Sequence, residues 1–325
     1  MDTLNKQFQE LEIGDCIRIL RLQRGLTQVQ LAYDSTLGEI CSSKQLSRYE
    51  NNEGTPNHGV LSKLLIALGS THGELDRMMN KHGLIYFNEA IIPLKKCFYN
   101  HDYQNAEKLL HKIKRMNCYN LEYPIIKQRL LFYEGVIQKN YYKEHRRSLG
   151  LLYNALKETS KNTLFKTPRS LDFHHIKHTA LDHIEYDILN SIASVYFETG
   201  RTDDALTLMK SMIDSLELPD TPYESKVKSL PVLYFNVSNY YLAIKDYSAA
   251  LQQTSKGIDF CHTTSENKEL LLIYYNHGCA LYESCNKSEG ITFFKKSLLL
   301  AELLNNQNYL NLMREELKTN YNLVL

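Results

Sequence analysis

The sequence has few residues that break helices and no excess of charge. Its 325 residues include only seven prolines and 14 glycines, and the formal net charge is +1. Abundant Leu, Lys, Glu, Asn and Tyr with so few helix breakers favour helices over sheets. The first 83 residues carry nine Lys and Arg against ten Asp and Glu. Without a general basic field, any contact with DNA must depend on one face of the molecule.

Signatures of secreted, membrane and catalytic proteins are also missing. The seven cysteines are an odd number, scattered and without a CxxC pair, which is typical of reduced thiols rather than a disulfide framework or zinc ribbon. The N-terminal residues lack a signal-peptide pattern, and no apolar run approaches the roughly 18 residues of a membrane span. We therefore predict a cytoplasmic protein with no membrane partner. No Walker loop, GxSxG, HExxH or dinucleotide fingerprint occurs, so we expect no enzyme, no catalytic residues and no cofactor.

Residues 1–80 have the pattern of one small domain of short helices. Ile13, Ile17 and Leu20 recur at helical spacing before Gly25, which is a credible helix stop. Thr27 is a candidate N-cap for a helix over residues 28–34, and Ser42 or Ser43 can cap the next helix. That helix ends at the breaker cluster NNEGTPN. Two further apolar-periodic stretches cover residues 60–68 and 72–79.

Residues 88–325 change to longer helices with an internal repeat. Segments 187–213, 232–258 and 272–298 align, and each has a Tyr- or Leu-rich first helix, a polar turn and a second helix. The second helices carry Ala205, Ala250 and Gly290, spaced 45 and 40 residues apart, and Ala106 holds the same place in a weaker copy. Another hairpin is expected over residues 128–159, and residues 160–182 interrupt the period. Small residues at a helix crossing allow close packing, and the pattern resembles the tetratricopeptide repeat.

The stretch of residues 24–50 contains Arg-Gly-Leu-Thr-Gln-x-x-Leu-Ala and then Leu-Ser-Arg-Tyr-Glu. It resembles the helix-turn-helix of phage repressor-type (Xre-like) DNA-binding domains, in which the second helix enters the major groove. The resemblance implies base contacts from Ser42, Ser43, Lys44, Gln45 and Arg48. Lys44 and Arg48 suit guanine and Gln45 suits adenine, and Gln28 matches a phosphate-contacting position.

Two further features of this stretch bear on the resemblance. Arg21 and Glu50 match a buried salt bridge of the phage repressors, which we interpret as structural. From Thr27 to Ser47 the chain is four residues longer than the common pattern, so the second helix is extended or the turn is a loop. A small helical adaptor bundle is the alternative to a DNA-binding domain, although packing does not explain a signature composed mostly of polar residues.

The whole chain resembles the peptide-pheromone regulators of low-GC Gram-positive bacteria, the RRNPP family that includes the PlcR, PrgX, NprR and Rgg groups. The resemblance implies an all-α fold, with a helix-turn-helix domain followed by a right-handed superhelix of tetratricopeptide-like hairpins. It implies a cytoplasmic transcription factor in which residues 1–80 bind double-stranded operator DNA. Residues 88–325 would bind a short signalling peptide on the concave face and mediate a homodimer.

Three asparagines occupy equivalent places in the first helices of the repeats: Asn190, Asn236 and Asn276. An Asn amide can pair with both sides of a peptide group, so these residues are candidates to hold an extended peptide. Asn190 and Asn236 match the asparagine clamp of PlcR-like regulators, and we rank Asn236 first. The flat walls of such a site would come from nearby tyrosines, although packing is the stronger interpretation for any one of them: Tyr234, Tyr241, Tyr275 and Tyr282.

Other interpretations stay open at this stage. His174 and His178 are four residues apart, but no partnering ligands appear and we predict no metal site. A DNA-binding repressor of a phage or mobile element, with a repeat domain that contacts a protein, fits the same motifs. A repeat scaffold without DNA binding is the alternative from a different class.

Overall fold

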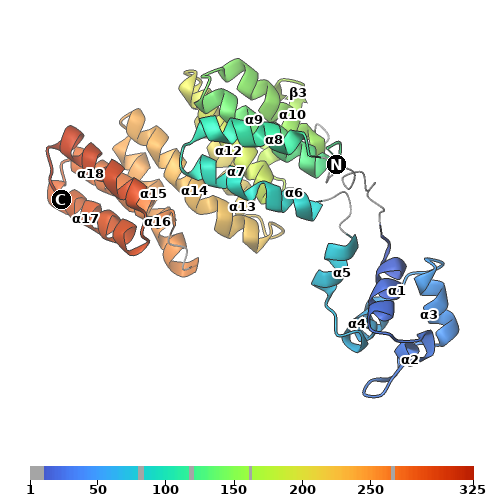
Figure 1. The fold of residues 1–325 in the computed structure, drawn as a ribbon. Helices are drawn as coiled ribbons and strands as arrows, with labels where there is room; N and C mark the ends of the chain where they lie inside the picture. The colour runs from blue at the N-terminus through green and yellow to red at the C-terminus, as the bar shows by residue number, and fades with distance from the viewer. Residues whose placement is uncertain (1–10, 80–83, 117–120, 161–162, 265–267) are drawn as a thin grey trace. The chain divides into compact units, whose positions relative to one another are not determined.

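The computed structural model describes residues 11–79, 84–116, 121–160, 163–264 and 268–325. The chain divides into two compact units, one with residues 1–96 and 111–126 and the other with residues 97–110 and 127–325. Helices dominate both units, as predicted (Figure 1), and the strands of the described residues form two short antiparallel pairs. None of the helices in the described ranges is long and apolar enough to cross a membrane.

Five short helices form the N-terminal helical domain: α1 (Ile13–Gln23), α2 (Gln28–Ala32), α3 (Ser43–Glu50), α4 (His58–Ala67) and α5 (His72–Met79). Their apolar faces share one buried cluster, which includes Ile17, Leu31, Leu46 and Leu64. Helix α1 ends where Gly25 adopts a left-handed backbone with φ of 67°, so the predicted helix stop is confirmed. Such a positive φ strains residues with a Cβ, which explains a glycine here.

The helices of the hairpin array follow in the expected order, although the helix expected to start at residue 232 begins well before it, at Tyr223. They are α6 (Leu84–Ala90), α7 (Ile92–Tyr99), α8 (Tyr103–Lys114), α9 (Pro124–Asn140), α10 (His145–Ser160), α11 (Phe173–Lys177), α12 (His183–Glu198), α13 (Thr202–Leu216), α14 (Tyr223–Ala243), α15 (Tyr247–Thr264), α16 (Leu270–Glu283), α17 (Lys287–Leu303) and α18 (Gln307–Tyr321). The three aligned segments become the hairpins α12–α13, α14–α15 and α16–α17, and α9–α10 supplies the fourth predicted one.

Each hairpin turn repeats one backbone device. A residue with positive φ lies five positions before the small residue: Gly200 before Ala205, Lys245 before Ala250, Cys285 before Gly290 and His101 before Ala106. The N–H that follows it donates back to the preceding helix, as from Arg201 to the Tyr196 carbonyl at 2.8 Å. This left-handed cap closes the first helix and starts the second at a fixed angle. The three alanines of this set are fully buried, which confirms their packing role.

The same device identifies a small residue that the sequence did not reveal. Lys143 has a φ of 58°, and Ser148 lies five positions later on α10. Ser148 is fully buried, and its hydroxyl donates to the Gly135 carbonyl of α9 at 2.8 Å. A serine therefore takes the place of alanine in this hairpin, because its hydroxyl finds an acceptor in the facing backbone.

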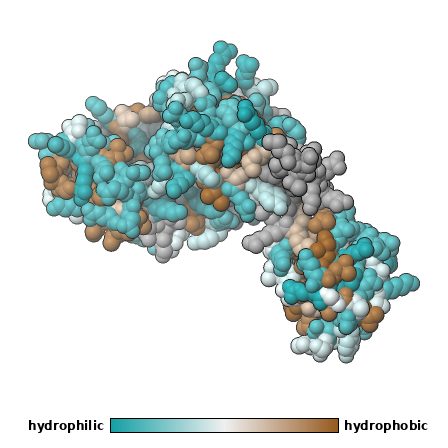
Figure 2. All heavy atoms as spheres, viewed as in Figure 1, coloured by the Kyte–Doolittle hydropathy of each residue, from teal (hydrophilic) through white to brown (hydrophobic). Residues whose placement is uncertain are grey.

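The interruption between α10 and α12 consists of a short strand pair and an extra helix. Strands β3 (Phe165–Thr167) and β4 (Ser170–Leu171) form a short antiparallel pair, and the extra helix α11 follows. Leu171 and Ile176 are buried in the main core of the array, so this segment is packed rather than loose. Polar residues cover most of the visible surface of each unit, with hydrophobic residues scattered among them (Figure 2).

Candidate functional site

Helix α3 presents a polar face at its N-terminal end. The Ser42 hydroxyl accepts the Gln45 N–H at 3.1 Å, so Ser42 rather than Ser43 is the N-cap. Leu46 and Tyr49 point into the core, whereas the side chains predicted to contact bases are all exposed: Ser42, Ser43, Lys44, Gln45 and Arg48. Gln45 Nε2 donates to Tyr49 Oη at 2.8 Å, which fixes the amide along the helix. The arrangement leaves donors and acceptors available to a partner on one side of α3.

The extra residues before α3 form a β-hairpin. Helix α2 ends at Ala32, two residues before the expected end, and β1 (Tyr33–Asp34) pairs with β2 (Gly38–Glu39). Asp34 Oδ1 accepts the N–H groups of Thr36 and Leu37 at 2.8 and 2.9 Å, which holds the loop. The turn between the two motif helices is therefore an ordered hairpin, and the extended second helix was the wrong alternative.

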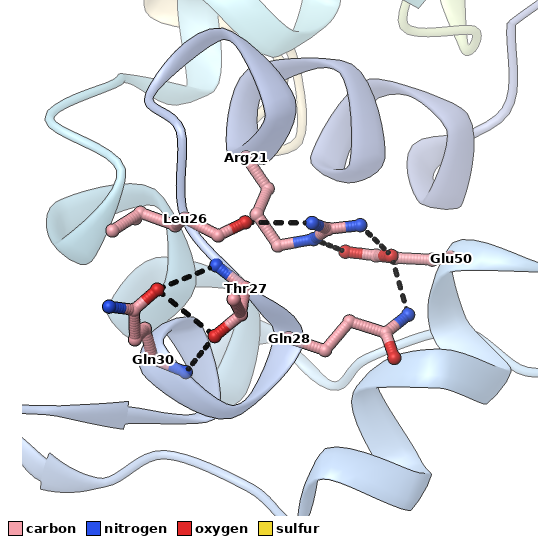
Figure 3. Close-up of polar contacts among 6 residues, drawn as sticks. All are labelled: Arg21, Leu26, Thr27, Gln28, Gln30 and Glu50. Atoms are coloured by element: carbon pink, nitrogen blue, oxygen red, sulfur yellow. Dashed lines mark hydrogen bonds and ion pairs between the residues drawn. The ribbon is translucent and has the colours of Figure 1, made fainter.

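A buried ion pair fixes α1 against α3 (Figure 3). Arg21 Nε and Nη2 donate to the two carboxylate oxygens of Glu50 at 2.6 and 2.8 Å, and Arg21 Nη1 donates to the Leu26 carbonyl at 2.8 Å. The Glu50 side chain is only 2% exposed, so the predicted structural salt bridge is confirmed. Such a shielded bidentate pair fixes the orientation of α3 relative to α1.

Gln28 belongs to the same network. Its Nε2 donates to Glu50 Oε2 at 2.8 Å, while Thr27 caps α2 through its hydroxyl (Figure 3). Burial by itself raises the pKa of Glu50, but hydrogen bonds from Arg21 and Gln28 and the charges of Arg21 and Arg18 outweigh burial and lower it. Glu50 thus stays ionised and orients the Gln28 amide. The predicted phosphate contact of Gln28 stays a prediction.

The array brings together two of the three predicted asparagines. Asn190 lies on α12 and Asn236 on α14, and Asn236 Nδ2 donates to Asn190 Oδ1 at 3.0 Å. Both side chains are half-buried. The bond leaves the Asn190 amide as a donor and the Asn236 carbonyl as an acceptor on adjacent helices. A peptide group needs one acceptor for its N–H and one donor for its C=O, and the pair offers both.

Asn276 does not join this pair. It is 3% exposed, and its Nδ2 lies within hydrogen-bonding distance of three acceptors: the Phe235 carbonyl at 3.2 Å, Ser238 Oγ at 2.8 Å and Asn239 Oδ1 at 2.9 Å. Its amide nitrogen therefore ties α16 to α14. The structure gives Asn276 a packing role that sequence spacing alone did not distinguish from that of Asn236.

The four predicted tyrosines all have packing partners. Tyr234 and Tyr241 belong to the main core of the array, and Tyr275 belongs to the core that α16, α17 and α18 share. Tyr282 is half-buried and contacts the Tyr321 ring at 4.9 Å between centroids. Their contact with a ligand stays a prediction, and packing accounts for their burial.

Polar residues that sequence reasoning missed continue the row of Asn190 along α12. Ser194 and Glu198 follow Asn190 at intervals of four residues, and Lys139 of α9 contacts both. The i, i+4, i+8 spacing was a signal that could have placed Ser194 and Glu198 on one helix face. No sequence signal could have placed Lys139 beside them, because that contact depends on how α9 packs.

The histidine pair is an aromatic contact. The rings of His174 and His178 lie 4.8 Å apart in an edge-on arrangement. Across the ranges that the structure describes, no group of three or more His, Cys, Asp or Glu side chains is placed to hold a metal ion.

A helix-turn-helix domain joined to an array of helical hairpins defines the class of this protein. The RNPP family C-terminal domain matches residues 153–323, and a helix-turn-helix family matches residues 17–75. No curated protein matches the chain. Because the C-terminal match covers more than half of the sequence, the chain belongs to the RNPP family.

Solved structures share the fold over nearly the whole chain. PlcR of Bacillus thuringiensis, solved with the peptide PapR7 and DNA, is 19% identical, with a TM-score of 0.70 over 93% of this chain and 98% of that one. ComR of S. thermophilus, solved with DNA and its signalling peptide ComS, is 14% identical, with a TM-score of 0.60 over 94% and 98%. The Streptococcus dysgalactiae SHP pheromone receptor Rgg2 is 15% identical, with a TM-score of 0.56 over 95% and 100%.

Proposed function

We propose that this protein is a cytoplasmic, homodimeric transcription regulator that a short signalling peptide switches. In this proposal residues 1–80 bind operator DNA and residues 88–325 bind the peptide and hold the dimer together. PlcR and ComR, which share the fold, were solved with DNA and a peptide. The observation that carries the proposal is the hydrogen-bonded pair Asn190 and Asn236, because an RNPP-family array here retains a donor and an acceptor ready for a peptide group.

The DNA-binding part of the proposal assigns roles along α3. Lys44 and Arg48 donate to guanine, Gln45 contacts a base edge, and Ser42 and Ser43 contact the groove at the start of the helix. Gln28 contacts a phosphate from the start of α2, where Glu50 holds its amide. A homodimer places two such helices on a two-fold operator. The peptide changes the arrangement of the dimer and thereby the fit to DNA.

A DNA-binding titration tests this proposal. Fluorescence anisotropy of labelled DNA from upstream of the gene should show that the purified protein binds this DNA and that its affinity falls as salt is added. Synthetic peptides that copy short reading frames beside the gene should then change the affinity. DNA binding without any peptide response would favour a repressor of a phage or mobile element whose array contacts a protein. Absence of binding to both would leave a repeat scaffold.

A further inference from the structure

Polar side chains from three helices lie around the carboxylate of Glu198. Lys139 Nζ of α9 lies 3.0 Å from Glu198 Oε1, and it also donates to Ser194 Oγ at 2.5 Å. Ser194 Oγ in turn donates to Glu198 Oε1 at 3.2 Å. His145, the first residue of α10, places Nδ1 3.8 Å from Glu198 Oε2. The group forms a closed polar cluster, which we call the Glu198 cluster: Lys139, His145, Ser194 and Glu198.

Lys139 is the most buried charged side chain of this cluster, and the carboxylate of Glu198 is the most exposed member. The Lys139 side chain is 13% exposed and the Glu198 side chain is 39% exposed. His145 Nδ1 is buried and makes no hydrogen bond among the described residues. A buried polar atom without a hydrogen-bond partner is costly, so this nitrogen has a hydrogen bond to offer that the present contacts do not use. An incoming acceptor can reach the cluster from the side that Glu198 exposes.

Glu198 is poorly matched to its own helix. It is the last residue of α12, where the carbonyl groups and the helix dipole disfavour negative charge. The contacts with Lys139 and Ser194 therefore hold the carboxylate in place. The charge of Glu198 also affects the pKa of two tyrosines on other helices. Burial is the main cause that raises the pKa of Tyr103 and of Tyr240, and the charge of Glu198 raises both further.

The cluster lies on the same helix as the asparagine pair and at a useful distance from it. Glu198 follows Asn190 by eight residues on α12, which corresponds to about 12 Å along the helix at 1.5 Å per residue. An extended peptide covers about 12 Å with three to four residues. A peptide held at its backbone by Asn190 and Asn236 would therefore reach the Glu198 cluster three to four residues further along.

We propose that Lys139, Ser194 and His145 form a subsite for a carboxylate of the peptide, and that Glu198 occupies this subsite until the ligand displaces it. The ligand carboxylate is the C-terminal group or an Asp or Glu side chain, since both present the same acceptor oxygens. This inference rests on the proposed peptide-binding function. Exchange of one carboxylate for another keeps Lys139 paired, so binding does not leave a buried cation without a partner.

Glu198 acts as an internal competitor in this scheme. Peptides without a suitably placed carboxylate cannot replace the negative charge that Lys139 requires. The ion pair between Lys139 and Glu198 therefore stays formed when such a peptide arrives. Peptides with one exchange it for Glu198, which turns to solvent at the end of α12. The subsite therefore selects both the charge of the peptide and the spacing of that charge from the backbone segment bound by the two asparagines.

Binding of defined peptide pools to the full-length protein tests the proposal. The pools are short, neutrally labelled peptides with apolar and neutral residues at random positions. One pool ends in a free carboxylate, one in a carboxamide, and one in a carboxamide with a single Asp or Glu at varied positions. The variants are Lys139→Met, Lys139→Arg, Glu198→Gln and Glu198→Ala. Glu224→Gln is the matched control, because it breaks the exposed Lys228–Glu224 ion pair on α14 of the same array.

We expect the variants to change the preference between the peptide pools rather than to weaken binding of every pool. Wild type should prefer a carboxylate pool over the plain carboxamide pool, and comparison of the two carboxylate pools identifies the source of the group. Glu198→Gln and Glu198→Ala should tighten binding of the carboxylate pool that wild type prefers by about tenfold, because each variant removes the ion pair that competes with the peptide. Lys139→Met should abolish the preference and Lys139→Arg should retain it, while Glu224→Gln should resemble wild type.

Two other outcomes separate this inference from the proposed function. Equal binding of the carboxylate and carboxamide pools by wild type and by both Glu198 variants would overturn the subsite and leave peptide binding intact. Failure of every pool to bind wild type would overturn both. A purely structural role of the cluster would lower the melting temperature and weaken all pools alike in the Lys139→Met and Glu198→Gln proteins, and this result would also overturn the subsite.

Discussion

Gly290 of α17 lies so close to Gly278 of α16 that a Cβ at Gly290 would sit 2.9 Å from the Gly278 carbonyl oxygen. The same Cβ would meet the backbone nitrogen of Tyr282 at 2.9 Å. Both obstacles are backbone atoms, which cannot turn away as a side chain can. The crossing of α16 and α17 therefore requires a residue without a side chain at position 290.

Gly290→Ala should lower the free energy of unfolding by about 1–3 kcal/mol, because the two helices must separate to admit the methyl group. Gly150→Ala is the matched control. Gly150 lies in α10, and a Cβ there meets nothing within 4 Å. Its substitution should stabilise the protein by about 0.5–1 kcal/mol through helix propensity. Calorimetry of the two variants measures both effects, and equal melting temperatures would contradict the packing explanation.

Loss of the Glu50 carboxylate should destabilise the N-terminal helical domain. Glu50→Gln leaves Arg21 buried without its counter-ion, which costs about 3 kcal/mol. The exposed Glu53→Gln is the control and should change the melting temperature little. Hydrogen exchange of α1 and α3 amides would locate the effect, and unchanged protection in Glu50→Gln would show that the ion pair does not fix α3.

The same carboxylate should make stability depend on pH. Because the folded-state pKa of Glu50 is lowered, its contribution is fully present above its ordinary pKa of 4.5 and is lost as pH falls through the lowered value. Wild type should therefore lose stability on acidification more steeply than Glu50→Gln, which has no proton to gain at this position. Melting curves of both proteins from neutral pH downward measure the difference, and parallel curves would contradict it.

Lys44→Ala and Arg48→Ala should each weaken DNA binding. Each variant removes a cation from the exposed face of α3, so the slope of log affinity against log salt should fall by about one if the side chain contacts a phosphate. A guanine contact would instead cost about 1–3 kcal/mol of discrimination at one base pair. Lys63→Ala, which removes an exposed cation from α4, is the control. An effect no larger than that of Lys63→Ala would remove α3 from the interface.

Asn236→Ala should weaken peptide binding, whereas Asn276→Ala should lower the stability of the array. Asn236 is half-buried and, among the described residues, its side chain bonds to Asn190 alone, so its loss should weaken peptide binding by about tenfold with little change in melting temperature. Asn276→Ala removes the buried donor shared by three acceptors on α14 and should cost about 1–3 kcal/mol of stability. Peptide affinity unchanged by Asn236→Ala would show that the clamp assignment is wrong.

The sequence alone determined the domain order, the helical class and the hairpin repeat. These features rest on local signals, because caps and crossings impose requirements on single positions. The signals are the helix periodicity, the Thr27 cap, the Gly25 stop and the small residues at 205, 250 and 290. The Arg21–Glu50 pair was also predictable, since the resemblance to phage repressors specified both partners and both helices. These features needed no knowledge of how distant segments meet.

Only the tertiary structure decided which equivalent residues differ in role. Asn236 and Asn276 occupy the same place in their repeats, but the packing of α14 against α12 and α16 pairs one with Asn190 and buries the other. Lys139 joins Ser194 and Glu198 across 55 and 59 residues of sequence for the same reason. Side-chain partners between helices depend on crossing angle and depth, which the pattern of any one helix does not contain. The sequence thus specified the helices, and their packing specified the sites.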